Sequence, residues 1–180
     1  LEGVDLRRPA LCGADLADLS QAAALGVNAV MQPFVRSADD LRVVRQTMAE
    51  NGLADAELFA KVENQPGLDA LPDWLALCDV VTIARGDLGS SLPLERLPAA
   101  QKRIAALCRS RGKPFLVVTQ LLHSMIDHPS PTRAEVLDIY NAVLDGADCL
   151  MLTGETAQGR YPLESADWLI RVAQEAEKAR

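Results

Sequence analysis

Asp79-Val80-Val81-Thr82-Ile83-Ala84-Arg85-Gly86-Asp87-Leu88-Gly89 joins a short apolar run to a segment that contains two glycines. The run is apolar on both faces, which is typical of a buried strand in a parallel sheet. Runs of the same kind recur at Asn28 to Phe34, Glu57 to Glu63, Pro114 to Gln120 and Cys149 to Thr153. The sequence therefore predicts five buried parallel strands.

Between and beyond these runs lie stretches whose apolar residues recur every three or four positions, as in amphipathic helices. They cover residues 15–25, 97–111, 132–144 and 165–178. A further stretch of this kind follows Ser37, which would cap it. Alternating strands and helices predict an α/β fold with a parallel sheet and right-handed crossovers. We expect a single domain over residues 1–180, which is shorter than the roughly 250 residues of a complete eight-stranded α/β barrel.

The composition excludes several classes of protein. The chain has 18 Lys plus Arg against 25 Asp plus Glu, a net charge of −7, which argues against an extended nucleic-acid surface. No apolar run approaches the roughly 18 residues of a membrane span, and Leu1 to Asp5 lack the features of a signal peptide. We therefore expect a cytoplasmic protein without a membrane partner. The chain begins with Leu1 rather than Met, which is compatible with a piece of a longer protein.

The four cysteines, Cys12, Cys78, Cys108 and Cys149, have no paired spacing. This pattern argues against a disulfide framework and against a CxxC metal site. We expect buried free thiols.

Polar residues follow the predicted strands, at the end of a parallel sheet where ligands bind. Lys61 and Glu63 point to the same side because side chains alternate along a strand. Asp87 lies in a glycine-containing turn after the next strand, where free N–H groups can meet an anion, as in a nest or at a helix N-terminus. The remaining strands end at Thr119-Gln120 and at Thr153-Gly154-Glu155-Thr156.

Two carboxylates from neighbouring strands, Glu63 and Asp87, suit Mg²⁺ or Mn²⁺. Lys61 beside them offers a compact positive charge for a phosphate or an enolate oxygen. The alternative is that Lys61 and Glu63 form only an ion pair and that the glycines form only a turn. Because these features share adjacent strand ends, the functional interpretation is favoured.

Six segments together resemble the successive signature blocks of the pyruvate kinase family, in the same order and over essentially the whole chain. They are Lys61 to Asn64, Ala84 to Gly89, Thr119 to Met125, Pro131 to Glu135, Asn141 to Asp148 and Met151 to Thr156. The resemblance implies a (β/α)₈ barrel, of which this chain corresponds to strands four to eight after an inserted lid domain. The expected fold is thus a partial barrel with about five strands.

The resemblance also implies a role for each matching residue. Glu63 and Asp87 would hold the divalent metal, and Lys61 would stabilise charge on the transferring phosphoryl group and on the enolate oxygen. The Thr119 hydroxyl would lie beside the substrate, in the proton relay to the enolate. The implied substrate-binding residues are Ala84, Arg85, Gly86, Asp87, Thr119 and Thr153.

Within that set, backbone groups of Ala84, Gly86 and Asp87 would receive the pyruvate carboxylate. Arg85 and the loop around Arg133 would lie near a subunit interface that borders the site. The implied partners are phosphoenolpyruvate or pyruvate, ADP or ATP, and further copies of the chain.

Four positions depart from the family pattern. Pro33 stands where Ser is frequent, and Thr153 replaces a usual Ser but keeps a hydroxyl. Gln158 stands where many members have Lys, so a positive charge expected near the nucleotide is missing. His123 replaces a frequent Glu, and we interpret it as structural.

Several parts of the family site have no counterpart in this chain. They are an arginine that contacts the phosphate, the ligands of the monovalent cation K⁺, part of the nucleotide site, the lid and the effector-binding domain. Five strands cannot close a barrel, so we expect the free edges to pair with another copy or with the rest of the parent protein.

Two other functions remain open from the sequence. One is a metal-dependent lyase or aldolase that acts through a pyruvate enolate, and the other is a non-catalytic assembly or regulatory module. The segments at 119–125 and 131–135 favour the kinase family over the lyase.

Overall fold

The structure is a computed structural model that describes residues 8–180. The sequence-based interpretation of Leu1 to Asp5 lies outside these residues. Among residues 8–180, no helix combines the length and the apolar character needed to cross a membrane.

Five parallel strands form one sheet in the order in which they occur along the chain. Every neighbouring pair is parallel, which confirms the predicted α/β fold. The strands are β1 (Ala29–Gln32), β2 (Glu57–Val62), β3 (Val80–Ala84), β4 (Phe115–Val118) and β5 (Cys149–Met151).

Helices connect the strands, and short 3₁₀ turns lie at Leu75–Leu77, Leu94–Arg96 and His123–Ile126. The predicted helices are all present, with ends that differ by a few residues. The helices are α1 (Gly13–Ala22), α2 (Ala38–Glu50), α3 (Gln65–Asp69), α4 (Leu71–Trp74), α5 (Arg85–Ser91), α6 (Leu97–Ser110), α7 (Arg133–Leu144), α8 (Gly154–Ala157) and α9 (Pro162–Glu177).

Local sequence explains where the longer helices begin and end. The Ser37 hydroxyl accepts a hydrogen bond from the Asp40 N–H and caps α2, and Thr132 forms a capping box with Glu135 at the start of α7. Gly112 and Gly146 follow α6 and α7 with φ of +59° and +98°. Both glycines adopt the left-handed conformation that commonly ends a helix.

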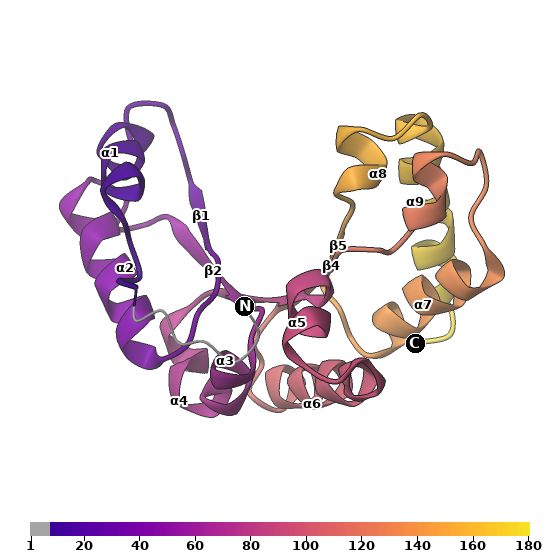
Figure 1. Cartoon of the computed structure of the whole chain (residues 1–180), viewed down its shortest axis with the longest axis horizontal. Coiled ribbons are helices and arrows are strands. Elements are labelled where there is room, and N and C mark those ends of the chain that lie inside the picture. Colours follow the sequence, from indigo (N-terminus) through magenta and orange to yellow (C-terminus); the bar gives the residue numbers. More distant parts are fainter. Residues whose placement is uncertain (1–7) are drawn as a thin grey trace.

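The elements follow an open arc, with helices on its outer side and the sheet on its inner side (Figure 1). The main core lies between the sheet and the helices; it includes Leu58, Ala60, Val62, Val81, Ile83, Phe115 and Val117 from the strands. A smaller cluster of Ala84, Leu116 and Val118 lies on the opposite, concave face. The fold is thus part of a barrel, with its strand ends directed to one side.

Only the middle of the sheet is buried on both faces. All four residues of β4 are buried, whereas β1 exposes Ala29 and Met31, and β5 exposes Cys149. The prediction of burial on both faces was therefore wrong for β1 and β5, and also for one face of β2, where Glu57 is exposed and Phe59 and Lys61 are half-buried. β1 and β5 are the two edges of the sheet, so within residues 8–180 each has only one neighbour.

Asp79 and Asp148 fix the strands at the end of the sheet opposite to the polar strand ends. The Asp79 carboxylate accepts a hydrogen bond from the Leu58 N–H at 2.7 Å, and the Asp148 carboxylate accepts one from the Phe115 N–H at 2.9 Å. Each aspartate N–H also donates to the carbonyl of the same partner, at 2.9 Å. These paired bonds set how far each strand extends toward the site.

The four thiols are all free, but only two of them are buried. Cys78 and Cys108 lie in the main core, whereas Cys12 and Cys149 are exposed. The prediction of buried thiols was therefore wrong for Cys12 and Cys149, which lie before α1 and on the edge strand β5.

Candidate active site

Lys61 and Glu63 lie together at the carboxyl end of β2. The Lys61 Nζ atom is 2.6 Å from the Glu63 Oε1 atom. Val62, which separates the two residues in the sequence, has its side chain buried in the main core. The Glu63 side chain is 1% exposed, while the Lys61 side chain is 22% exposed. A buried carboxylate therefore holds an ammonium group that still reaches solvent.

The second oxygen of Glu63 binds the loop after β1. Its Oε2 atom accepts a hydrogen bond from the Phe34 N–H at 2.7 Å. Phe34 has a φ of +51°, and the residue is 54% exposed. Sequence reasoning did not identify Phe34, because a backbone N–H carries no side-chain signature.

Two buried side-chain oxygens within residues 8–180 have no hydrogen-bond partner, Glu63 Oε1 and Thr82 Oγ1. Lys61 approaches Glu63 Oε1 as an ion pair without the alignment of a hydrogen bond. Lys61 is also the register partner of Thr82, so the two side chains lie on the same face of the sheet. A buried oxygen that accepts no hydrogen bond calls for an explanation, and a bound polar ligand or ion is one.

The residues present fit a hard divalent cation. Glu63 offers a carboxylate oxygen that accepts no hydrogen bond and is ion-paired with Lys61, and the Asp87 carboxylate in the first turn of α5 is exposed and makes no hydrogen bond or ion pair with the described residues. The described part of the chain contains no group of three or more His, Cys, Asp or Glu that could hold a metal. Mg²⁺ is compatible with such a site because it commonly takes one or two carboxylates and fills its remaining positions with substrate oxygens and water.

The segment from Ala84 to Asp87 forms the cap and first turn of helix α5, so of the nest and the helix N-terminus that the sequence allowed, the structure has the helix N-terminus. Gly86 has no left-handed φ; its N–H donates a hydrogen bond to the Thr119 hydroxyl at 2.7 Å. The N–H groups of a first helical turn have no partner within the helix, and Thr119 meets one of them. The structure thus brings the third and fourth strand ends together.

Arg85 is buried, with 8% of the residue exposed. Its Nε and Nη2 atoms donate to the Thr119 carbonyl at 3.2 and 2.7 Å, and its Nη1 atom lies 2.7 and 2.6 Å from the two oxygens of Asp138 on α7. The guanidinium of Arg85 is therefore engaged within this chain. Arg133, which was expected at the same interface, is exposed.

Thr153 lies in the loop after β5 and binds Glu155. The Glu155 carboxylate accepts hydrogen bonds from the Thr153 N–H at 2.9 Å, from the Thr153 hydroxyl at 3.3 Å and from the Leu122 N–H at 3.1 Å. Burial raises the pKa of Glu155, but these donors outweigh it and hold the pKa below its usual value. Glu155 joins the loops after β4 and β5, and sequence reasoning assigned it no role.

Glu135 supports the loop after β4 from the start of α7. It accepts hydrogen bonds from the Ser124 N–H and hydroxyl at 2.7 and 2.6 Å, and from the Thr132 N–H and hydroxyl at 2.8 Å each. Burial opposes ionisation of Glu135, yet the donors lower its pKa. Glu135 thus anchors the loop after β4 to the start of α7.

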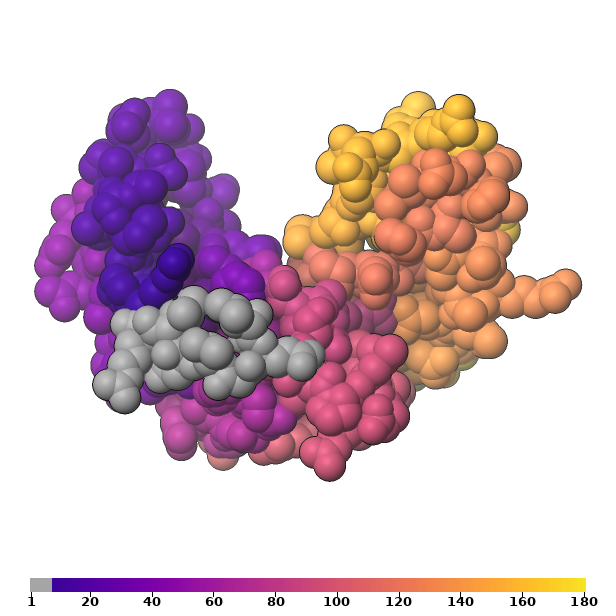
Figure 2. All heavy atoms as spheres, in the orientation of Figure 1, coloured from indigo at the N-terminus to yellow at the C-terminus, as the bar shows by residue number. Residues whose placement is uncertain are grey.

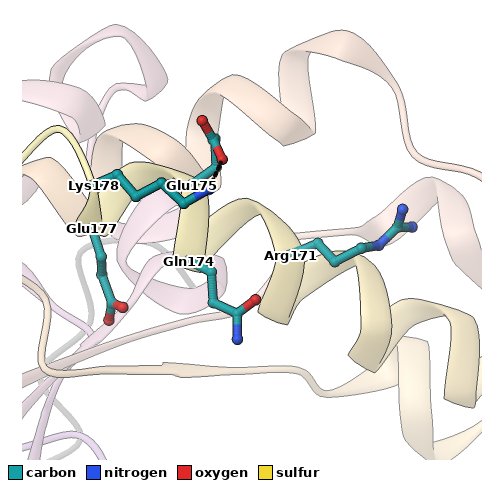
Figure 3. Close-up of a pocket in the computed structure, with 5 residues that line it drawn as sticks. All are labelled: Arg171, Gln174, Glu175, Glu177 and Lys178. Atoms are coloured by element: carbon teal, nitrogen blue, oxygen red, sulfur yellow. Dashed lines mark hydrogen bonds and ion pairs between the residues drawn. The ribbon is translucent and has the colours of Figure 1, made fainter.

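The concave side of the sheet opens into the hollow that Figure 2 shows between the N-terminal and C-terminal arms of the arc. A separate shallow hollow lies on α9 (Figure 3), and its lining comes from that helix and the residue that caps its C-terminus: Arg171, Gln174, Glu175, Glu177 and Lys178. These side chains carry both signs of charge, and none belongs to a strand end. The hollow on α9 is therefore not part of the candidate site.

Comparison with known protein families and curated proteins agrees with this geometry. Residues 1–166 match the family model of the pyruvate kinase barrel domain. The chain is 44% identical to a pyruvate kinase of Kluyveromyces lactis, 41% to one of Dictyostelium discoideum and 40% to one of Clostridium acetobutylicum. These alignments cover 99%, 98% and 97% of this chain but 36%, 35% and 37% of the relatives.

The chain thus spans about a third of the length of the curated relatives that it matches. The family match covers well over half of the chain. The chain belongs to the pyruvate kinase family, within its barrel domain.

Proposed function

We propose that this chain carries part of a site that transfers the phosphoryl group of phosphoenolpyruvate to ADP, giving pyruvate and ATP. The observation that carries the proposal is the Lys61–Glu63 pair, a reachable ammonium beside a buried carboxylate with an open oxygen. The family of the chain supports the same reaction. The remaining parts of the site would come from other regions of the whole protein.

Glu63 and Asp87 are the residues that would hold Mg²⁺ or Mn²⁺. When bound, such a cation neutralises negative charge on the transferring group and orients it. Lys61 places a second positive charge at the same strand end. As the phosphorus–oxygen bond of phosphoenolpyruvate breaks, negative charge develops on the enolate oxygen, and the Lys61 ammonium would stabilise it.

Thr119 would take part in protonation of the enolate carbon. Its hydroxyl oxygen already accepts the Gly86 N–H at 2.7 Å, so the proton of the hydroxyl is free to be donated. Transfer of this proton to the enolate would complete pyruvate, and water would restore the hydroxyl proton. A relay residue needs an oxygen that is held in place and a proton that it can donate, and the Thr119 hydroxyl would supply both.

The start of α5 would receive the carboxylate of the substrate. The backbone N–H groups of Arg85, Gly86 and Asp87 lie in the first turn, and Ala84 precedes them. The Gly86 N–H would be shared between this carboxylate and the Thr119 hydroxyl, which would place the hydroxyl beside the substrate. Thr153 completes the substrate-binding set at the end of β5, where its hydroxyl donates to Glu155 and can accept a bond from a ligand.

We place the K⁺ ligands, the phosphate-binding arginine, most of the nucleotide site and the lid outside this chain. The whole protein would be a homo-oligomer in the cytoplasm. Arg85, which the family resemblance places among the substrate-binding residues, acts in this proposal through Thr119 rather than on the substrate.

The reaction is tested with the full-length gene product, phosphoenolpyruvate, ADP, Mg²⁺ and K⁺. Pyruvate and ATP should appear in equal amounts and only when ADP is present. Cleavage of a carbon–carbon bond in a pyruvate-derived substrate without ADP would favour the lyase. Absence of both activities, in protein that binds neither phosphoenolpyruvate nor metal, would favour a non-catalytic module.

A further inference from the structure

Thr119 and Gln120 form an unusual pair at the end of β4. Their φ angles are +75° and +54°, in the left-handed region that residues with a side chain rarely adopt. The conformation is especially unfavourable for Thr, which is branched at Cβ. Two consecutive residues of this kind persist only where the surrounding structure holds them.

Arg85 holds the peptide group between these two residues. Its Nε and Nη2 atoms both donate to the Thr119 carbonyl, which fixes the orientation of that peptide plane. On the other side, the Thr119 hydroxyl accepts the Gly86 N–H. Thr119 is thus bound through its carbonyl and through its side chain, both times by the first turn of α5.

Asp138 in turn fixes Arg85. Both oxygens of its carboxylate lie within 2.7 Å of Arg85 Nη1. The Arg85 side chain is 9% exposed, so its charge would be poorly compensated without a carboxylate. Asp138 is 36% exposed and lies on α7, after the loop that follows β4, so it links this helix to the strand ends.

We propose that Asp138 is a positioning residue, which acts through Arg85 to keep the Thr119 hydroxyl at the site. Its effect on turnover rests on the proposed function, whereas its effect on the backbone at Thr119 does not. Arg85 then serves as a connector between α7 and the loop after β4. Removal of the Asp138 charge leaves Lys61, Glu63 and Asp87 in place but lets the Thr119 loop relax.

The test compares Asp138→Asn with the control Asp167→Asn in the full-length gene product. Asp167 forms an exposed ion pair with Arg171 on α9, away from the strand ends. Hydrogen exchange is followed without substrate in a peptide that covers residues 84–90. Asp138→Asn should accelerate exchange of the Gly86 amide by about tenfold, because charge-assisted bonds are the strong ones, and Asp167→Asn should not.

Steady-state kinetics supply the second readout. Asp138→Asn should lower kcat for pyruvate formation by about tenfold, with KM for ADP unchanged, and Asp138→Glu should restore part of the loss. Wild-type exchange at Gly86 in Asp138→Asn, or an equal effect of Asp167→Asn, would overturn the proposal. If Asp138→Asn accelerates Gly86 exchange but the wild-type protein does not transfer the phosphoryl group, the positioning role is supported and the proposed reaction is overturned.

Discussion

The ammonium of Lys61 lies 2.6 Å from a buried oxygen of Glu63 that has no hydrogen-bond partner in the described part of the chain. A cation bound at this oxygen would compete with Lys61 for it. The ammonium would then be free to meet the negative charge of a phosphoryl group. In the proposed function, the ion pair would thus supply both a metal ligand and a catalytic charge.

Glu63→Gln should weaken Mn²⁺ binding by about tenfold or more, because an amide oxygen replaces a carboxylate. The expected change can be measured by titration of Mn²⁺ followed by electron paramagnetic resonance. Glu57→Gln is a matched control, since Glu57 is an exposed carboxylate at the other end of β2. Equal affinities of Glu63→Gln and the control would remove Glu63 from the metal site.

Asp87→Asn should also weaken Mg²⁺ binding, by about tenfold. Asp87 is exposed and unpaired within residues 8–180, so its loss should leave the fold unchanged. Isothermal titration with Mg²⁺ gives the affinity, and circular dichroism checks the fold. Glu95→Gln, an exposed carboxylate in the turn after α5, should bind Mg²⁺ like the wild type. Unchanged affinity in Asp87→Asn would contradict its assignment as a ligand.

Glu155→Gln should lower the free energy of unfolding at pH 7 by about 1–3 kcal/mol, since Glu155 is buried and accepts three hydrogen bonds. Its folded-state pKa lies below the ordinary value of 4.5. The ionised carboxylate therefore contributes stability that is present above that value and is lost as the pH falls through the folded-state pKa.

The difference in the free energy of unfolding between Glu155→Gln and the wild type should accordingly shrink in acid. Urea unfolding at a series of pH values measures it, with the exposed Glu164→Gln as the control. A difference that stays constant from pH 7 into the acid range would show that ionised Glu155 does not bind its donors as the structure indicates.

Burial raises the pKa of Cys78 to about 11 and that of Cys108 to about 12. At pH 8 both thiols should therefore resist alkylation by N-ethylmaleimide, because the thiolate is the reactive form. Cys12 is exposed and provides the internal comparison. Mass spectrometry of the labelled peptides should show modification of Cys12 first, and Cys78 and Cys108 only after denaturation. Early labelling of Cys108 would contradict its place in the core.

The sequence was sufficient to predict the five strands, because short runs of Val, Ile, Leu and Phe alternate with helical spacing. It also predicted that Lys61 and Glu63 share a side, since that follows from the two-residue period of a strand. It failed to predict which strands are edges. The composition of β1 resembles that of a central strand, and only the sheet order exposes Ala29 and Met31.

Contacts between distant elements were equally beyond sequence reasoning. Phe34 acts through its backbone N–H, and Asp138 reaches Arg85 from 53 positions further along the chain. Neither contact leaves a local pattern. The glycines at 86 and 89 were compatible with a nest or with a helix N-terminus, and only the structure shows that the chain continues into α5, because Gly is permitted in both.

The central claim is that the strand-end site around Lys61 performs phosphoryl transfer. Its most direct test is kcat/KM for pyruvate formation from phosphoenolpyruvate in full-length Lys61→Met, compared with Lys102→Met, which removes an exposed lysine on α6. Lys61→Met should lower kcat/KM by about a hundredfold or more, as expected when a charge that stabilises a transition state is lost. Equal values for Lys61→Met, Lys102→Met and the wild type would contradict the claim.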